Sequence, residues 1–305
     1  MSEELMNTQE VARYLDINEK QVYNLIKSGR IPATKVTGKW LFPKRIIEDW
    51  IEANAKKGLK EAKERGKKIA GALLTAGSND PVLDVLLSRL RRSHPEIYVF
   101  SANVGSQSGL EALKAGYTDI AWTHLLDMES GEYNIPYVST HLSDLKPVII
   151  NIFRRELGFL TAAGNPLNFR GFEDLADHRI RLINRQPGSG TRVLLDYHLA
   201  MRNIAKELIQ GYDSQVYTHY EVGLAVVSGE ADVGVATRAI SRILGLPFIP
   251  ITQECFDMVL TQETFFKKSV QAFMEVLNSP DFRKQAANLG SYDFSHASSI
   301  VYTSV

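Results

Sequence analysis

From residue 70 to the end of the chain, short apolar runs alternate with segments of helical periodicity, and this alternation limits the possible folds more than any other feature. The apolar runs 69–77 and 97–105 are each followed by a helical pattern, at 81–93 and 108–116. Such alternation is typical of α/β proteins with a mostly parallel sheet. We therefore expect an α/β domain that binds its ligand at the carboxyl ends of the strands.

The junctions between these predicted strands and helices are small and polar. They read AGSNDP at 76–81, VGSQSG at 104–109 and NRQPGSGT at 184–191. A helix N-terminus offers unpaired N–H groups and a partial positive charge, which suit an anion. The third junction lacks the lysine of a nucleotide-binding loop, because Arg192 follows Thr191. We therefore expect a compact anion rather than a nucleotide.

The first 50 residues predict a small, separate module of two helices and a hairpin. We expect Thr8 to cap the first helix and Asn18 to cap the second, which should end at Gly29. Two helices with so tight a turn predict a helix-turn-helix whose second helix enters a DNA major groove, and 35–44 predicts a basic wing. The candidates for DNA contact are Lys20, Gln21, Tyr23, Asn24, Lys27, Lys35, Lys39 and Lys44.

Charge is divided unevenly along a chain whose formal net charge is zero. Residues 1–70 carry 15 Lys and Arg against 10 Asp and Glu, which leaves 20 against 25 for the remainder. A basic head on an acidic body favours a polyanion as the partner of the head. On charge alone, a solvated lysine-rich linker explains the excess equally well.

Two resemblances to known families cover nearly the whole chain. Through TQEVARYL, KQVYNLIKSGRIPA and GKWLFPKRIIEDWI, residues 6–54 resemble the excisionase and mercury-resistance-regulator type of winged helix-turn-helix. Residues 70–305 resemble the molybdate-binding type of periplasmic-binding-protein-like domain, which is a type 2 domain. The matching segments are GSNDPVLDVL, VGSQSGLEALKAGYTDIAWTHLLDMESGEYN, INRQPGSGTRVLLD, VVSGEADVGVATRAIS and LPFIPITQECFDMVL.

The second resemblance implies two lobes that close on a ligand, joined by crossing strands near 148–156 and 248–254. The expected organisation is a DNA-binding domain (1–54), a linker (55–69) and an anion-binding domain (70–305), with lobe one formed by 70–150 and 252–305 and lobe two by 153–250. The ligand-binding candidates that it implies are Ser78, Asn79, Ser106, Gln107, Thr123, His124, Arg185, Ser189, Gly190, Thr191, Arg192 and Tyr220.

Two histidines near this predicted cleft stay open at this point. His124 follows a predicted strand and is a candidate donor, although a lone histidine there more often has a structural role. His219 lies in THYEVGLAVVSG, which departs from the T-H-x-x-V-A pattern of the resembling family, so its role is undecided. Glu221 would be unfavourable beside an anion and is expected to be peripheral.

Several classes of function are not indicated. The seven histidines show no metal-ligand spacing, Cys255 has no partner motif and no G-x-S-x-G elbow occurs, so we expect no catalytic residue, no metal and no cofactor. The N-terminus lacks the apolar stretch of a signal peptide and no apolar run is long enough to span a bilayer, so we expect a cytoplasmic protein with no membrane partner.

Together these features predict a one-component transcriptional regulator. Operator DNA would bind to the head and molybdate or tungstate to the cleft as effector. A homodimer or higher homo-oligomer is expected from DNA symmetry alone. Alternatives are a sensor of another anion or of a small organic acid such as formate and, less favoured, an anion-handling enzyme.

Overall fold

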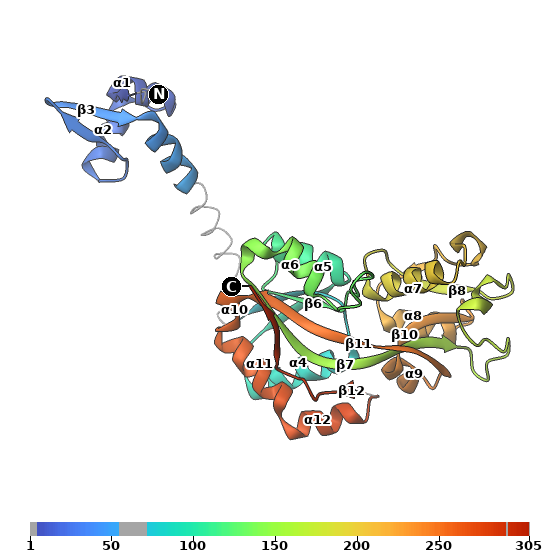
Figure 1. Cartoon of the computed structure of the whole chain (residues 1–305). Coiled ribbons are helices and arrows are strands. Elements are labelled where there is room, and N and C mark those ends of the chain that lie inside the picture. The colour runs from blue at the N-terminus through green and yellow to red at the C-terminus, as the bar shows by residue number, and fades with distance from the viewer. Residues whose placement is uncertain (1–4, 55–71, 291, 305) are drawn as a thin grey trace. The chain divides into compact units, whose positions relative to one another are not determined.

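The computed structural model describes residues 5–54, 72–290 and 292–304 and divides the chain into two compact units, 1–68 and 69–305 (Figure 1). The predicted linker, 55–69, lies outside the described residues. Each unit has hydrophobic clusters of its own. Among the described residues, the hydrophobic cluster of the first unit contains residues between positions 6 and 50. The hydrophobic clusters of the second unit contain only residues from position 73 onward.

The first unit is a winged helix-turn-helix. Its three-stranded antiparallel sheet has the order β1-β3-β2 and packs with the helices around the buried side chains of Val11, Val22, Phe42 and Ile47. The elements are β1 (Leu5–Asn7), α1 (Thr8–Tyr14), α2 (Glu19–Lys27), β2 (Thr34–Val36), β3 (Lys39–Pro43) and a helix over residues 44–54.

The caps of the first unit differ in one place from the prediction. Asn18 caps α2 as expected. The cap of α1 is Asn7 and not Thr8, because the Asn7 side chain accepts from the N–H groups of Gln9 and Glu10. The Glu10 side chain accepts in turn from the Asn7 N–H at 2.8 Å, which completes a capping box.

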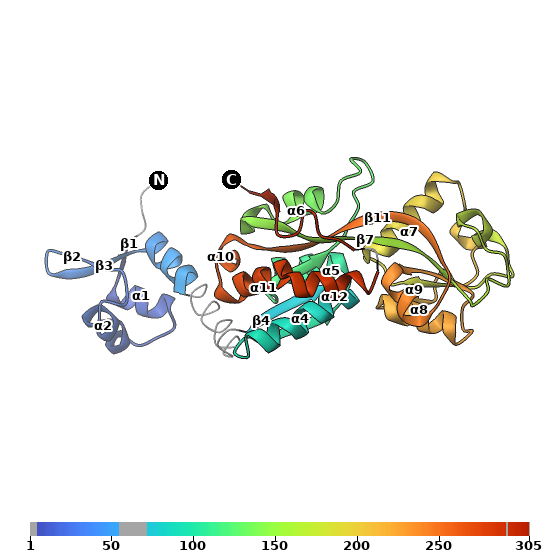
Figure 2. The same ribbon diagram turned by 90° about the horizontal axis from the view of Figure 1, so that it is seen from below.

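The second unit is a two-lobed α/β domain built on one ten-stranded sheet (Figures 1 and 2). The order of the strands is β5-β4-β6-β11-β7-β10-β8-β9, and β12 and β13 also pair with β7. Its strands are β4 (Leu73–Gly77), β5 (Val99–Asn103), β6 (Ile120–Thr123), β7 (Pro147–Thr161), β8 (Leu182–Arg185), β9 (Gln215–Val216), β10 (Val233–Thr237), β11 (Phe248–Thr261), β12 (Tyr292–Asp293) and β13 (Ile300–Thr303). Its α-helices are α4 (Pro81–Ser93), α5 (Ser106–Lys114), α6 (Ile135–His141), α7 (Gly190–Met201), α8 (His219–Val227), α9 (Arg238–Leu244), α10 (Gln262–Phe265), α11 (Lys268–Asn278) and α12 (Pro280–Ala287).

The expectation of a mostly parallel sheet was wrong, since the sheet is mixed. Strands β5, β4 and β6 are parallel in lobe one, as are β10, β8 and β9 in lobe two. The two long strands β7 and β11 pass through both lobes and pair antiparallel with each other from Phe248↔Leu160 to Thr261↔Pro147. They are the crossing strands, because a chain that leaves lobe one and later returns to it must run in opposite directions.

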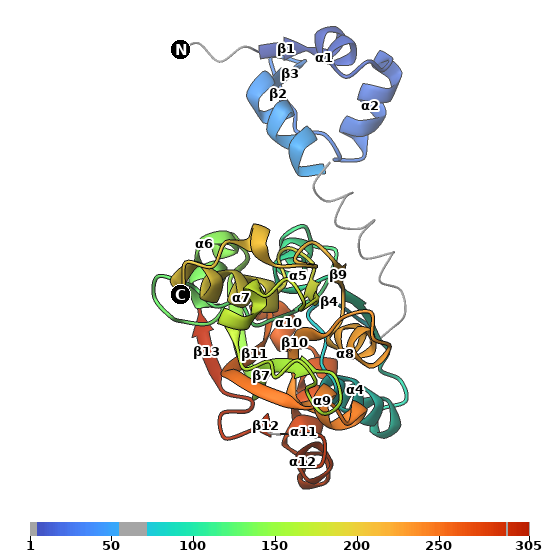
Figure 3. The ribbon, with the colours of Figure 1, turned by 90° about the vertical axis from the view of Figure 1, so that its right-hand side faces the viewer.

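Helices cover both faces of the sheet in each lobe. In lobe one, α4, α11 and α12 pack together on one face (Figure 2). In lobe two, α7 packs on one face, and α8 and α9 pack on the other (Figure 3). This arrangement leaves the loops after β4, β6 and β8 facing the junction of the lobes.

Candidate ligand-binding cleft

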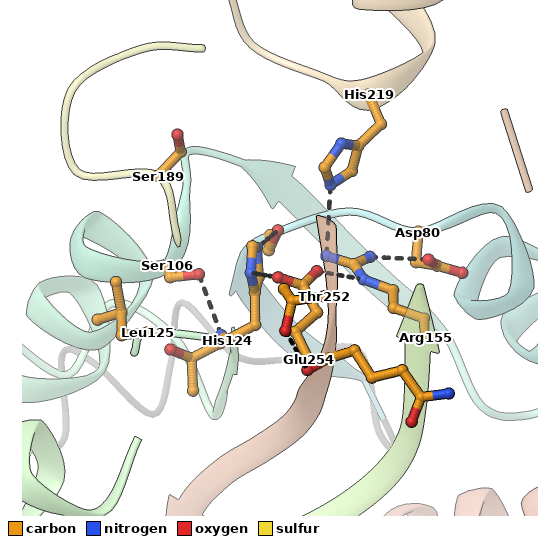
Figure 4. Close-up of polar contacts among 12 residues, drawn as sticks. Asp80, Ser106, His124, Leu125, Arg155, Ser189, His219, Thr252 and Glu254 are labelled. Atoms are coloured by element: carbon orange, nitrogen blue, oxygen red, sulfur yellow. Dashed lines mark hydrogen bonds and ion pairs between the residues drawn. The ribbon is translucent and has the colours of Figure 1, made fainter. Parts of the chain in front are cut away.

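Polar side chains from both lobes meet where β7 and β11 cross (Figure 4). Asp80 lies in the loop after β4, and His124 directly follows β6. The middle of β7 supplies Arg155, β11 supplies Glu254, and His219 is the first residue of α8. Each of these five residues is almost completely buried, so each must be paired or held for a ligand.

One continuous chain of hydrogen bonds connects groups of lobe one with Arg155 and Glu254 of the crossing strands. The Ser78 hydroxyl lies 2.8 Å from His124 Nε2, and His124 Nδ1 lies 2.9 Å from Glu254 Oε2. Arg155 donates from Nε to Glu254 Oε1 and from Nη1 to Asp80 Oδ2, each at 2.7 Å. Asp80 Oδ1 also accepts from the Val82 N–H and the Tyr292 hydroxyl. All four oxygens of the two carboxylates are therefore engaged.

The lobe-two groups, in contrast, keep unused hydrogen-bonding atoms. Arg185, whose exposure is 1%, donates from Nε to Gln186 Oε1 and from Nη2 to the Tyr217 carbonyl. Its Nη1 atom has no hydrogen-bond partner among the described residues. The same holds for His219 Nδ1, Gln186 Nε2 and Thr191 Oγ1. Buried polar atoms are seldom left unsatisfied, so several in one place point to a ligand.

The tautomer of His219 follows from its neighbour. His219 Nε2 lies 3.3 Å from Arg155 Nη2, and a guanidinium can only donate. Nε2 therefore accepts, and the proton of the neutral ring sits on the unpaired Nδ1. Burial, followed by the charges of Arg185 and Arg155, lowers the pKa of His219 well below its usual range. His219 is thus a neutral ring whose Nδ1–H group is buried and has no hydrogen-bond partner among the described residues.

Burial and neighbouring charges also shift the pKa of Arg185 and the pKa of Glu254. Burial, reinforced by Arg155, lowers the pKa of Arg185 to about 9. Burial alone would raise the pKa of Glu254, but His124 and Arg155 lower it to about 2. The cluster therefore holds Glu254 as a carboxylate and leaves Arg185 as an incompletely compensated cation.

The lobes touch at the edge of this cluster. The Gln107 N–H donates to the Gly188 carbonyl at 3.2 Å, which joins the start of α5 to the loop before α7. A methyl group at Gly190 would lie 2.5 Å from His124 Nδ1, closer than side chains approach. The structure therefore shows the lobes closed against each other, with glycine required at the contact.

A metal ion does not suit the cluster. His124, His219 and Glu254 bring atoms of ligand type within 4.8 Å of one another. The Arg155 guanidinium, however, already pairs with Glu254 and lies against His219. Both Glu254 oxygens are already engaged and His219 Nε2 accepts from Arg155, so a metal ion would have to displace the guanidinium.

The structure places most of the predicted ligand-binding residues at this junction. Besides the residues above, Ser106 Oγ accepts from the His124 N–H, the Asn79 carbonyl accepts from Arg155, and Ser189 caps α7. Thr191 is buried beside Ser189 in the first turn of α7.

Four of the predicted residues have other surroundings. Thr123 donates to Asn134 in the core of lobe one, and the Tyr220 side chain is 45% exposed. The exposed Gln107 side chain donates to Glu111, so only its backbone takes part. Arg192 is a structural anchor, since it donates to Asp196 and to the Arg185 and Tyr212 carbonyls, and its guanidinium stacks 3.9 Å from the Tyr212 ring centroid.

Sequence reasoning missed Asp80, Arg155 and Glu254 and left His219 undecided. Arg155 and Glu254 belong to segments that were interpreted only as crossing strands. The available signal was the presence of charged residues within two mainly apolar strands, because a buried charge needs a reason. Glu221 is peripheral as expected, since its carboxylate accepts from Thr218 and the Tyr217 N–H at the start of α8.

On the head, the predicted DNA-contacting residues lie mostly on the surface. Lys20, Tyr23, Asn24 and Lys27 are exposed on α2. Gln21 is also exposed, but its Oε1 accepts from the Asn18 N–H at 3.1 Å as part of the helix cap. The wing residues are placed as follows: Lys35 and Lys39 are exposed, Lys35 Nζ lies 5.6 Å from the Trp40 ring centroid, and Lys44 is half-buried.

A two-lobed domain with polar groups converging between its lobes, joined to a helix-turn-helix, defines a ligand-binding protein with a DNA-binding head. Residues 87–278 match the PBP superfamily domain and residues 5–55 match a helix-turn-helix domain. The chain belongs to the PBP superfamily, and both expected resemblances are confirmed. Neither domain is of an enzymatic type.

Relatives and solved structures agree with this assignment. The chain is 31% identical over 292 residues to the uncharacterized protein YvgK of Bacillus subtilis, covering 93% of this chain and 94% of that protein. A substrate-binding protein from Clostridium perfringens, solved with bound phosphate, is 15% identical with a TM-score of 0.52, covering 74% of this chain and 98% of that one. OxyR of Corynebacterium glutamicum is 14% identical with a TM-score of 0.50, covering 93% and 89%. The two structures establish the fold.

Among the described residues, no helix has the length and apolar character needed to cross a membrane.

Proposed function

We propose that this protein is a one-component transcriptional regulator that binds operator DNA through its head and a small oxyanion, molybdate or tungstate, in its cleft. The observation that carries the proposal is the set of buried, unpaired donor atoms at the lobe junction: Arg185 Nη1, His219 Nδ1 and Gln186 Nε2. Thr191 Oγ1 adds a hydroxyl at the start of α7.

The hydrogen-bonding character of this set favours an oxyanion without protons. Both carboxylates at the junction already have all their oxygens occupied, by Arg155, His124 and the partners of Asp80. A ligand with several acceptor oxygens would satisfy the remaining donors. A ligand that carries a hydrogen-bond donor of its own would find an acceptor in Asn79 Oδ1, which is buried and has no partner among the described residues, but neither carboxylate has an oxygen left for it.

Because the two domains belong to one chain, closure of the lobes on a ligand can change DNA binding by the head. A ligand can bias DNA binding only through its different affinities for the open and closed states of the lobes. The Gln107–Gly188 contact joins the two lobes, so a ligand that binds the free lobe-two donors and also contacts lobe one would favour the closed state. We propose that the protein acts as a homodimer in the cytoplasm, where operator DNA is available.

Thermal unfolding of the full chain with molybdate, tungstate, sulfate, phosphate or formate tests the ligand. A ligand that binds only the native state adds about 2.7 kcal/mol when its free concentration is 100 times its dissociation constant. We expect stabilisation by molybdate and tungstate, its loss in Arg185→Gln, and its retention in the control Arg179→Gln, which alters an exposed arginine paired locally with Asp177.

One observation also favours a second candidate, a sensor of a small organic acid. The free Nη1 of Arg185 could pair with a carboxylate as readily as with an inorganic oxyanion. Stabilisation by formate alone would support this candidate and contradict the metal oxyanion.

DNA binding tests the regulator itself. Fluorescence anisotropy over a range of salt concentrations measures binding to the DNA upstream of the protein's own gene, and an absence of binding would contradict the regulator.

A further inference from the structure

The hydrogen bond between Ser78 and His124 has a direction, and that direction decides what Ser78 can offer a ligand. Glu254 Oε2 accepts from His124 Nδ1, so the proton of a neutral imidazole sits on Nδ1. Nε2 must then accept from the Ser78 hydroxyl at 2.8 Å. In this state Ser78 has no proton left to donate and would turn only lone pairs toward an anion.

The charges around His124 balance before any ligand enters. Two guanidinium groups, Arg155 of β7 and Arg185 of β8, face two carboxylates, Asp80 of the loop after β4 and Glu254 of β11. His219 of α8 completes the surroundings as a neutral ring, 6.3 Å from His124 between ring centroids. The Glu221 carboxylate of α8 also acts on Arg185, so a doubly charged anion would enter a buried site without net positive charge, which is unfavourable unless a compensating positive charge forms.

Of the two cleft histidines, only His124 can supply that charge without losing a contact. His219 Nε2 accepts from Arg155, so its protonation would set a cation against a cation. Protonated His124 would donate from Nδ1 to the Glu254 carboxylate and from Nε2 to the Ser78 oxygen, both of which accept. Ser78 would then be free to rotate its hydroxyl.

We infer that His124 sets the charge of the ligand that the cleft accepts: when a doubly charged oxyanion binds, His124 takes up one proton from solvent and Ser78 redirects its hydroxyl from the imidazole to the ligand. The inference rests on the proposed function, since it concerns the same cleft. It names the ligand class as tetrahedral dianions and assigns His124 as the residue that selects them over monoanions.

The pH dependence has a definite sign. Burial lowers the pKa of unliganded His124, and the opposing effect of Glu254 does not restore it. The free protein is therefore neutral at His124 near pH 7, and the bound protein carries the extra proton. Because a bound proton stabilises the complex, affinity for a dianion falls about tenfold per pH unit between the free and the bound pKa of His124.

Titration calorimetry of the full chain at pH 7.5, in two buffers with different ionisation enthalpies, measures the proton directly. We expect uptake of about one proton with sodium tungstate or molybdate and none with sodium perrhenate, a tetrahedral monoanion of similar size. Tungstate binding without proton uptake would overturn this inference alone. If none of the anions binds, the proposed function fails and this inference fails with it.

Two histidine variants locate the proton. His124→Gln is expected to abolish the uptake and to lower the preference for tungstate over perrhenate at least tenfold, whereas His219→Gln, the matched histidine, keeps the uptake. The reverse pattern would assign the proton to His219 and refute the inference. If His124→Gln does not fold, anion affinities of the wild-type protein at several pH values test the inference instead. Tungstate affinity must then fall between pH 7 and 8 while perrhenate affinity stays constant.

Discussion

Replacing Gly190 with alanine should block closure of the lobes while leaving each lobe intact. Gly190 begins α7, and its backbone is of a kind that alanine adopts freely. A methyl group there would lie 2.5 Å from His124 Nδ1 and 2.6 Å from the His124 carbonyl oxygen. Those atoms belong to lobe one, so the clash exists only in the closed state.

The size of the effect follows from the geometry. Overpacking of this kind costs about 1–3 kcal/mol, which weakens anion binding by about 5- to 150-fold if binding requires closure. Alanine is also the better helix former, although Gly190 is the first residue of α7 and the gain there is smaller than the gain of about 1 kcal/mol at an interior position. Thermal stability without ligand should therefore fall little or even rise, while affinity falls.

Calorimetric titration with tungstate, together with unfolding without ligand, measures both quantities. Gly171→Ala is the matched control, because the nearest atom to its added methyl is the Glu173 carboxylate oxygen at 3.7 Å. Wild-type affinity in the Gly190 variant would show that the anion does not bind between closed lobes, and the proposed position of the ligand would have to be abandoned.

Three further predictions concern the two units. Phe42→Ala should destabilise the head by about 3–5 kcal/mol and abolish DNA binding, while tungstate still binds; loss of both activities would contradict the separation of the cores. Asn7→Ala should cost about 1 kcal/mol of head stability in a denaturant titration, and an unchanged midpoint would show that the cap of α1 does not contribute. Because the pKa of Glu254 is lowered to about 2, its contribution to stability is complete above pH 4.5 and is lost as pH falls toward 2, so Glu254→Gln should flatten that part of the pH–stability curve; an equally steep fall would assign the acid sensitivity elsewhere.

The alternation of apolar and helical segments was sufficient to predict much of the fold. The helix expected over 81–93 is α4, with the same bounds, and Asn18 and Gly29 mark the ends of α2 as predicted. The pattern could not show that β7 and β11 are antiparallel, because the direction of a strand relative to its neighbours depends on the path of the chain between them and not on its own residues. Local patterns define elements, and pairing depends on contacts remote in sequence.

The candidate cleft was predictable only in part. Ser106 and Ser189 stand at helix N-termini, and Ser78 lies two residues before the Asp80 cap of α4, so local sequence carries the signal. The ion pairs of Arg155 join Asp80 and Glu254 across 75 and 99 positions of sequence, and no local pattern encodes such a pairing. The tautomers of His124 and His219 depend on those same partners and require the folded structure.

The separate cores of the two units have an evolutionary consequence. Because no hydrophobic cluster of the described residues spans both units, substitutions that refine the cleft for a new effector need not disturb the helix that reads DNA. Gene fusion at the segment between the units would join an existing operator specificity to a different chemical signal in one step. Lineages can therefore diversify the effector and the regulated genes independently.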